Sequence, residues 1–398
     1  MTRQRDKAQP PAPERRLADD LRGASRLAIA AVTGIADTVE AVHQNVAAVA
    51  LPLGQGKGSR TRGITGLVYG SVRGITRLVG AGVDSVLGVA APWLGATPEH
   101  PSALAAQAAL NGVYGDYLAA SGNPLAFRMR LHHQGQALQP DTGPLRVAEP
   151  SPHLLILLHG LCMNDLQWRR EGHDHGAALA ADHGMSALYL RYNSGRRVGE
   201  NGRELAVLLE RLIAAWPVPV ASVSLLGHSM GGLVARSAID AAQSADARWP
   251  ARLRSLICLG TPHLGATLER AGHHAERLLS LSPYSAPLAR LGGRRSAGIR
   301  DLRQGQLRLG ELDQHVPWPQ AVACHAIAAT RSKSTARPLG DGLVSVDSAL
   351  GRHADPQRAL PLPQERQHLL TDCDHFKLLN DPRAYAILTR AIGEALHG

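Results

Sequence analysis

The sequence has 398 residues, of which 44% are hydrophobic and 19% are charged. This globular composition excludes a chain that is disordered along its whole length. Aromatic residues make up only 4%, so any core or pocket must be built mainly from aliphatic side chains, and the formal net charge of +10 permits an anionic partner without determining the fold.

The cysteines and the apolar runs bear on the compartment. Cys162, Cys258, Cys324 and Cys373 contain no CxxC pair, so the zinc-ribbon and thioredoxin signals are absent and reduced, buried thiols are expected. The polar first residues lack the pattern of a secretory signal. No run approaches about 18 uncharged apolar residues, the length of a membrane span. We therefore expect a cytoplasmic protein and leave peripheral membrane contact open.

The first third of the chain predicts helices. Residues 1–16 resemble a disordered tail, and residues 17–122 form a predicted helical extension with a linker at 51–60. The phrase RGIT at 62–65 recurs at 73–76, and this 11-residue period suits a nearly straight amphipathic helix. Because several glycines weaken that helix, it needs a partner surface. A hairpin packed on itself or on the main domain is favoured, while binding to a membrane or lipid granule and oligomerisation stay open.

A further helix is predicted at 101–120, with a bend within it where Asn-Gly and Gly-Asp follow one another. Residues 123–398 then change character. Strands are expected at 127–131 and 153–158, and strands and helices alternate from there onward, which predicts an α/β fold with a mostly parallel sheet.

One motif in this region carries a nucleophile. The predicted strand 222–226 runs into Gly-His-Ser-Met-Gly, and a predicted helix at 233–242 follows. In this G-x-S-x-G pattern Ser229 stands on a tight strand-to-helix turn, which projects its hydroxyl above the sheet. The glycines let strand and helix converge, and the helix N-terminus favours a developing negative charge.

Upstream, the buried strand 154–158 ends in His159-Gly160-Leu161. Together with the serine motif, this phrase resembles the α/β-hydrolase superfamily, and within it the bacterial lipases and esterases, including GPI-inositol-deacylase-like serine esterases. The resemblance implies an oxyanion hole formed by the backbone N–H groups of Leu161 and Met230. His159 is expected to shape its loop rather than to react.

A third phrase, Gly-Thr-Pro-His-Leu-Gly, follows the predicted strand 255–259 and is common in the same enzymes. His263 in this phrase is a tempting base. The triad order of the superfamily is serine, acid, histidine, so a histidine before the acid is misplaced. We therefore interpret His263 as a loop-shaping residue near the site.

The acid should follow a later strand, predicted at 321–329. Asp341 lies in Asp-Gly-Leu-Val, which resembles the acid loop of these lipases, and a carboxylate there would orient and stabilise the imidazole. Asp347 is the alternative acid.

The base is expected on a loop before the closing helix, predicted at 384–395. His375 occupies that place, and its Asp-His phrase again follows the pattern of the family. Asp372 and Asp374 are interpreted as solvated loop carboxylates, and His368 falls too early, just before or inside the last strand.

Other features of the chain suggest less specific roles. An insertion at about 266–319 is a predicted lid with leucines and a basic run, which is either a solvated face or a contact for an anionic lipid surface or an acidic substrate. The histidine clusters 132–133, 173–175 and 273–274 lack metal-site spacing. Nucleic-acid binding is supported by net charge alone.

These inferences predict an α/β-hydrolase fold with an N-terminal helical extension and a lid. The predicted function is that of a serine hydrolase that cleaves carboxylic esters through a triad of Ser229, Asp341 and His375, without a cofactor and with an acyl-ester or lipid substrate. A thioesterase, an acyltransferase, a granule polyester depolymerase and a non-enzymatic membrane or granule scaffold remain the alternatives.

Overall fold

The structure is a computed structural model that describes residues 18–30, 33, 71, 74, 76, 78, 81, 84–85, 100–265, 296–310, 316–334 and 340–397. The chain divides into two compact units, Met1–Glu99 with Ser121–Leu125, and His100–Ala120 with Ala126–Gly398. Of the recurring residues of the 11-residue repeat, the structure describes Gly74, Thr76 and Leu78, and the others lie outside the described residues. Residues 266–295 and 311–315 of the predicted lid also lie outside them.

The smaller unit contains helical residues from both predicted helical segments. Residues 18–30 are helical, and so are the described residues between 71 and 85. Arg22 and Arg26 each bind the carboxylate of Asp84 through two hydrogen bonds, at 3.2 Å from Arg22 and 2.8 Å from Arg26. These charge-assisted contacts join the two segments, as a hairpin that packs on itself would require.

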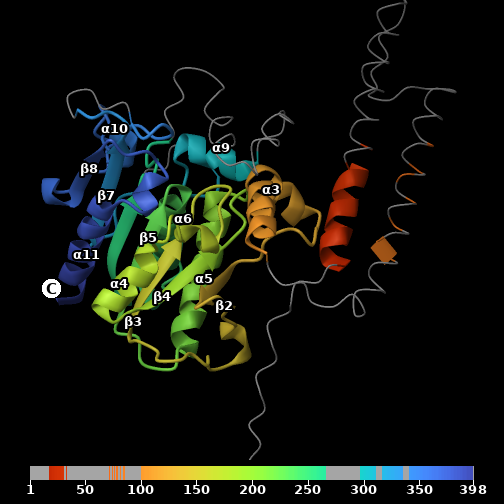
Figure 1. The fold of residues 1–398 in the computed structure, drawn as a ribbon, viewed down its shortest axis with the longest axis horizontal. Helices are drawn as coiled ribbons and strands as arrows, with labels where there is room; N and C mark the ends of the chain where they lie inside the picture. The colour runs from red at the N-terminus through yellow and green to blue at the C-terminus, as the bar shows by residue number, and fades with distance from the viewer. Residues whose placement is uncertain are drawn as a thin grey trace, which may run out of the picture. The chain divides into compact units, whose positions relative to one another are not determined.

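The larger unit is built on one eight-stranded sheet with the order β2-β1-β4-β3-β5-β6-β7-β8 (Figure 1). The pairing of β1 with β2 and with β4 is antiparallel, and the remaining pairs are parallel. The strands are β1 (Arg130–His133), β2 (Gln136–Ala137), β3 (His153–Leu158), β4 (Ser186–Arg191), β5 (Ser222–His228), β6 (Leu253–Leu259), β7 (Ala323–Thr330) and β8 (Gln367–Thr371).

Helices cover both faces of this sheet (Figure 1). They are α3 (Pro101–Ala120), α4 (His175–His183), α5 (Val198–Ala215), α6 (Met230–Ser244), α9 (Ala297–Gln304), α10 (Val346–Ala349) and α11 (Pro382–His397). The predicted α/β-hydrolase fold is confirmed by this mostly parallel sheet with its flanking helices. The expected bend in α3 is also present, at Tyr114, where φ is −124° and ψ is 18°.

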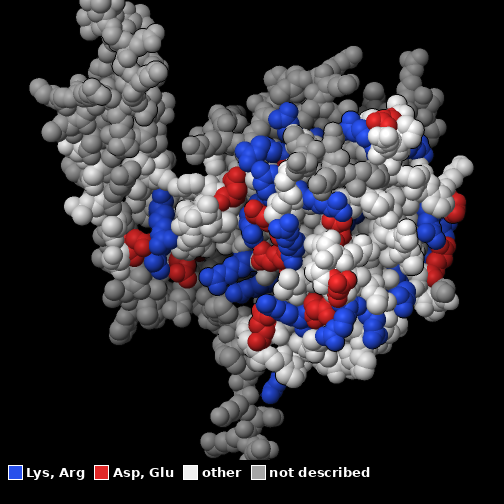
Figure 2. Space-filling model, turned by 180° about the vertical axis from the view of Figure 1, so that it is seen from behind, with Lys and Arg blue, Asp and Glu red and all other residues white. Residues whose placement is uncertain are grey.

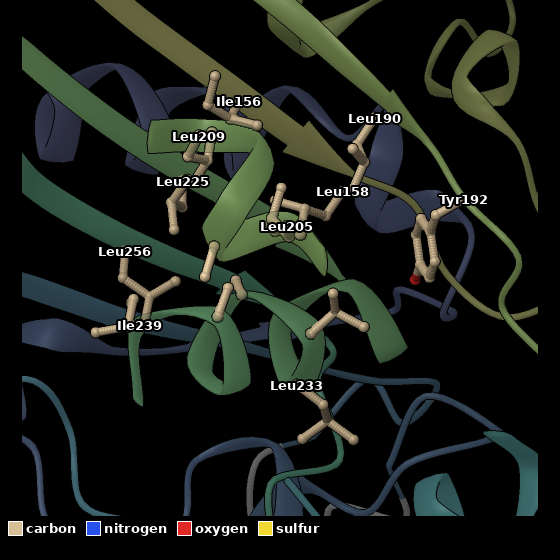
Figure 3. Close-up of a cluster of buried hydrophobic side chains, with 14 of the residues drawn as sticks. Ile156, Leu158, Leu190, Tyr192, Leu205, Leu209, Leu225, Leu233, Ile239 and Leu256 are labelled. Atoms are coloured by element: carbon tan, nitrogen blue, oxygen red, sulfur yellow. The ribbon is translucent and has the colours of Figure 1, made fainter. Parts of the chain in front are cut away.

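The central strands are buried on both faces and therefore read as continuous apolar runs. On β3, Ile156 and Leu158 pack with α5 and α6 in the cluster drawn in Figure 3, whereas Leu155 and Leu157 face the cluster that includes α4 and α11. Leu205 of α5 and Leu233 of α6 belong to the first cluster (Figure 3). Aliphatic side chains thus supply most of the core, as the scarcity of aromatic residues predicts.

The four cysteines are free and buried, in agreement with the expectation of reduced thiols. Within the described ranges, no helix is both long enough and apolar enough to cross a membrane.

Candidate active site

Ser229 occupies the turn between β5 and α6. Its φ of 53° and ψ of −122° are strained for a residue with a side chain, as the turn of a nucleophile requires. Two flanking glycines permit this turn. A Cβ at Gly227 would lie 2.4 Å from the Gly232 nitrogen, and one at Gly231 would lie 2.1 Å from the Leu158 oxygen. Neither position accepts a side chain, so steric exclusion explains why both residues of the motif are glycine.

Asp341 and His375 form a buried pair, each with 2% of its surface exposed. The Nδ1–H of His375 donates to Oδ2 of Asp341 at 2.6 Å. The other carboxylate oxygen accepts the backbone N–H groups of Leu343 at 2.9 Å and Val344 at 2.8 Å. With Nδ1 held as a donor, Nε2 keeps the lone pair that a general base needs.

The serine turn lies against this pair. The Ser229 N–H donates to the carbonyl oxygen of Leu259 at 2.8 Å. A Cβ at Gly260, the next residue, would lie 3.1 Å from His375 Nδ1 and 3.2 Å from Asp341 Oδ2. His375 Nε2 is buried and has no hydrogen-bond partner among the described residues, the Ser229 hydroxyl included. Such bonds are often long in unliganded enzymes and tighten when substrate binds.

The loop after β3 borders the same serine. A Cβ at Gly160 would lie 3.2 Å from the Ser229 Cβ, so this loop approaches the nucleophile closely. Leu161 and Met230 are both buried. Within the described ranges, neither of their backbone N–H groups donates to a protein acceptor. Two free N–H donors beside a serine are what an oxyanion hole needs.

His159 shapes this loop, as expected. Its Nδ1–H donates to the Gly160 oxygen at 2.8 Å, and its ring stacks on Tyr192 with centroids 4.3 Å apart. The Tyr192 hydroxyl donates to the His159 carbonyl oxygen at 2.7 Å. Burial lowers the pKa of His159 to about 4, so the ring is neutral at pH 7 and is committed to holding the loop.

His263 is likewise committed elsewhere. Its Nδ1 accepts from Arg236 Nη1 at 3.2 Å, and its ring meets Trp318 edge-on. Arg236 also donates to the Val316 carbonyl oxygen and lies over the Trp318 ring, 5.0 Å from the centroid. Burial holds the pKa of His263 well below its usual value. The histidine therefore fastens its loop to α6, in agreement with the loop-shaping interpretation.

The alternative carboxylates do not contact the imidazole of His375. Asp347 is exposed in the first turn of α10. Asp374 accepts the N–H groups of Phe376 and Lys377, both at 2.9 Å, and so caps a turn. His368 lies inside β8, as expected.

Sequence reasoning overlooked His228, although it lies within the serine motif. Its Nε2–H donates to the His375 carbonyl oxygen at 3.0 Å, and the two rings are 4.7 Å apart. Burial, followed by the proximity of His375, holds the pKa of His228 well below its usual value. The signal available in the sequence was a histidine, in place of an apolar residue, at the end of a buried strand.

The histidine clusters have structural partners. His173 Nε2–H donates to His175 Nδ1 at 2.8 Å, and His175 Nε2–H donates to the Leu378 oxygen at 3.0 Å. His133 Nδ1–H donates to the Ala187 oxygen at 3.0 Å. Residues 273–274 lie outside the described ranges. In the part of the chain that the structure describes, no group of three or more His, Cys, Asp or Glu residues could hold a metal ion.

Comparison with known proteins supports the fold. Residues 152–279 match the family model of the PGAP1-like alpha/beta domain. This segment carries the His-Gly-Leu, Gly-His-Ser-Met-Gly and Gly-Thr-Pro-His phrases, so the resemblance inferred from them is confirmed. No curated protein matches the chain.

Several solved structures are similar. Bacillus licheniformis lipase BlEst2 in its mature form has 20% sequence identity and a TM-score of 0.42, and the match covers 62% of this chain and 94% of that one. Pyrococcus furiosus esterase Pf2001 has 16% identity and a TM-score of 0.40, with 67% and 88% covered. A lipase-esterase related protein from Clostridium acetobutylicum has 13% identity and a TM-score of 0.36, with 67% and 98% covered.

Proposed function

We propose that this chain, whose residues 152–279 match the PGAP1-like alpha/beta domain, is a serine hydrolase that cleaves carboxylic esters. The observation that carries this proposal is the Asp341–His375 pair, 2.6 Å apart, against the strained turn of Ser229. Fold alone does not determine function, so the proposal depends on this group of side chains.

In the proposed reaction His375 Nε2 takes the proton of the Ser229 hydroxyl as its oxygen attacks the ester carbonyl. Asp341 stabilises the imidazolium that forms. The backbone N–H groups of Leu161 and Met230 bind the oxyanion, an interaction worth about 2.7–4 kcal/mol for one donor in a known hydrolase. The imidazolium then protonates the leaving alcohol, and water activated by the same histidine releases the acid from the acyl-enzyme.

The surroundings of the site favour this chemistry. Ser229 is only 3% exposed, and both members of the Asp341–His375 pair are buried. Low exposure strengthens the attraction between carboxylate and imidazolium relative to water. The aliphatic composition predicts an acyl pocket lined by Leu, Val and Ile, which would distinguish chain lengths by only about 1–3 kcal/mol per methylene. We therefore expect several acyl lengths to be accepted.

The test is hydrolysis of p-nitrophenyl esters from acetate to palmitate, with a parallel series of acyl thioesters. We expect turnover by the wild type and loss of at least about 10³-fold in kcat for both Ser229→Ala and His375→Ala. His263→Ala is the matched histidine control, because this residue contacts Arg236 and Trp318 rather than Asp341. It should retain most of the turnover if it remains folded.

Two outcomes would contradict the proposal. Wild-type protein that cleaves no ester or thioester would remove the hydrolase assignment. A Ser229→Ala variant with full turnover would show that another group attacks the carbonyl. Preference for thioesters, or transfer of the acyl group to an added alcohol in place of water, would instead select the thioesterase or acyltransferase alternative.

Contact with a membrane or lipid granule is a separate proposal, based on the N-terminal helices and the basic lid of the sequence. On the face seen in Figure 2, basic and acidic side chains are interspersed. Arg308 of the basic run binds Asp240 through bonds of 2.6 and 2.8 Å. Flotation of the full chain with anionic and with neutral vesicles tests it, and failure to float with either would contradict it. The cytoplasmic location stays a prediction.

A further inference from the structure

Helix α3 lies directly on the loop that carries Leu161, although α3 precedes the matched domain in the sequence. A Cβ at Gly112 of α3 would lie 2.2 Å from Cys162 Sγ and 2.9 Å from the Cys162 Cα and nitrogen. Real side chains do not approach backbone so closely, so only glycine lets the helix and the loop meet here. The Cys162 thiol in turn donates to the Ala109 carbonyl oxygen at 3.8 Å.

The loop itself is strained at this contact. Met163 N–H donates to the Gly160 oxygen at 3.3 Å, which closes a four-residue turn around Leu161 and Cys162. Cys162 is the third residue of that turn and has a φ of 60°, a position where turns with positive φ favour glycine. A cysteine in this conformation persists only if its surroundings impose it.

A second contact fixes the same residue from the other side. The Cys162 N–H donates to Ser194 Oγ at 3.1 Å. The segment after β4 that carries Ser194 is itself held by α3, because Asn193 Nδ2–H donates to the Gly115 oxygen at 2.8 Å. A Cβ at Gly115 would lie 1.8 Å from Asn193 Oδ1. Helix α3 therefore supports the loop both directly and through this segment.

The described start of α9 forms hydrogen bonds with α3 and with the segment after β4. Ser296 Oγ–H donates to the Gly112 oxygen at 2.7 Å, and the Ala297 N–H donates to Asp116 Oδ2 at 2.9 Å. The Gly298 N–H donates to the Gly195 oxygen at 2.9 Å. The first two bonds anchor α3 at Gly112, which meets Cys162, and at Asp116, which follows Gly115. The third bond anchors the segment after β4.

We propose that α3 positions the oxyanion loop, with Gly112 as a positioning residue that acts through Cys162. Leu161 lies between Gly160, held by His159, and Cys162, held by α3 and Ser194, so the direction of its N–H is fixed from both sides. An oxyanion donor must stand about 2.7–3.1 Å from the oxygen it stabilises, and displacement by about 1 Å can cost 10²-fold in rate. This inference rests on the proposed esterase function and names a support for its oxyanion hole outside residues 152–279.

Gly112→Ala tests the proposal, with Gly393→Ala as the matched control. Gly393 lies in α11, where an added Cβ would meet only His183 Cε1 at an ordinary 3.5 Å. Gly112→Ala should lower kcat for a p-nitrophenyl ester about 10–100-fold with KM within about twofold. It should weaken binding of a trifluoromethyl ketone, which forms an oxyanion on the serine, by a similar factor. Gly393→Ala should match the wild type in kcat, in KM and in affinity for the trifluoromethyl ketone.

A second variant and a second measurement cover a Gly112→Ala protein that does not fold. Ser194→Ala adds no bulk and removes the acceptor of the Cys162 N–H, so kcat should fall about 3–10-fold. Hydrogen exchange of the peptide that spans 159–166 should be faster in both variants than in Gly393→Ala. Folded variants with wild-type kcat, inhibitor affinity and exchange would overturn the proposal.

The two proposals fail in different ways. Absence of turnover in the wild type contradicts the esterase function, and the exchange measurement then still decides whether α3 holds the loop. Turnover in the wild type that Gly112→Ala and Ser194→Ala leave unchanged contradicts the positioning role alone.

Discussion

His228 Nε2–H donates a hydrogen bond of 3.0 Å to the backbone carbonyl oxygen of His375. The residue that directly precedes the proposed nucleophile is thereby tied to the proposed base, across 147 positions of sequence. The bond joins the end of β5 to the loop before α11. This contact fixes the distance between the end of β5 and the loop that carries His375, and it involves no atom that takes part in the proposed reaction.

Replacing His228 should therefore impair turnover more than substrate binding. His228→Leu leaves the buried His375 carbonyl without its donor, which costs about 1–3 kcal/mol of stability and lets the base loop shift. We expect kcat to fall about tenfold or more with KM little changed, measured with a p-nitrophenyl ester. His228→Gln retains an N–H donor and should recover part of the loss. Equal rates for His228→Leu and the wild type would contradict this positioning role.

Asp341→Asn should be severely impaired for a reason visible in the hydrogen bonds. Oδ1 of Asp341 accepts two backbone N–H groups, from Leu343 and Val344. An asparagine would keep its oxygen on those donors and turn its amide N–H₂ toward His375 Nδ1. The imidazole would then accept at Nδ1 and carry its proton on Nε2, the wrong tautomer for a base. The equivalent change in a serine protease lowers kcat about 10⁴-fold.

Asp347→Asn is the control for this change. Asp347 is exposed in the first turn of α10, so its replacement should alter kcat less than about twofold. The measurement is kcat for both variants, with circular dichroism to verify the fold. A large loss in Asp347→Asn together with near-normal turnover in Asp341→Asn would reverse the assignment of the acid.

Acid should destabilise the protein through His159. Burial lowers its pKa to about 4 in the folded chain, against about 6.5 when unfolded. As the pH falls from about 6.5 to about 4, the unfolded state therefore binds a proton that the folded state does not, and stability is lost over this window. Its contribution between pH 6.5 and pH 5 is about 2 kcal/mol.

His159→Gln removes the group that binds this proton. Between pH 6.5 and pH 5 the free energy of unfolding of the variant should therefore fall about 2 kcal/mol less than that of the wild type. Urea unfolding at pH 6.5 and pH 5 measures the difference. If the free energy of unfolding of His159→Gln fell with pH as steeply as that of the wild type, protonation of His159 would not be the cause of the loss.

The buried ion pair next to the oxyanion loop predicts a large loss of stability. Arg191 Nε donates to Asp165 Oδ1 at 2.5 Å, and the two side chains are 9% and 3% exposed. Arg191→Met would remove the guanidinium from the buried Asp165 carboxylate and leave it the imidazole of His132, 3.5 Å away. Breaking a buried pair by removing one partner typically costs about 3–5 kcal/mol. Urea unfolding should detect this loss at pH 7.

The exposed pair of Arg211 and Asp141 is the natural comparison. Its bond is 2.8 Å long, but the side chains are 56% and 62% exposed. Arg211→Met should change the free energy of unfolding by less than about 1 kcal/mol. Similar losses in the two arginine variants would show that burial does not determine how much each pair contributes to stability.

The sequence by itself predicted the central strands, the turn at Ser229 and the residues of the candidate site. Continuous apolar runs predicted β3, β5 and β6 because a parallel strand is buried on both faces. The glycines around Ser229 predicted the strand-to-helix turn because no side chain fits where β5 and α6 converge. The order of serine, acid and histidine favoured His375 over His263. The resemblance of Asp-Gly-Leu-Val to an acid loop favoured Asp341 over Asp347, and the structure places Asp341 and His375 2.6 Å apart.

Only the tertiary structure decided which buried polar groups hold these parts together. The role of His228 follows only from the contact between the end of β5 and the loop before α11. The role of Arg236 follows only from its contacts with His263 and Trp318. The role of α3 depends on contacts between Gly112 and Cys162, which are 50 positions apart. Local periodicity records which face of an element is apolar, but a close approach between distant segments depends on the geometry of both. The physical reason is that a glycine in the sequence shows only that a side chain is absent at that position. The tertiary structure decides which atoms of a distant segment come close to it.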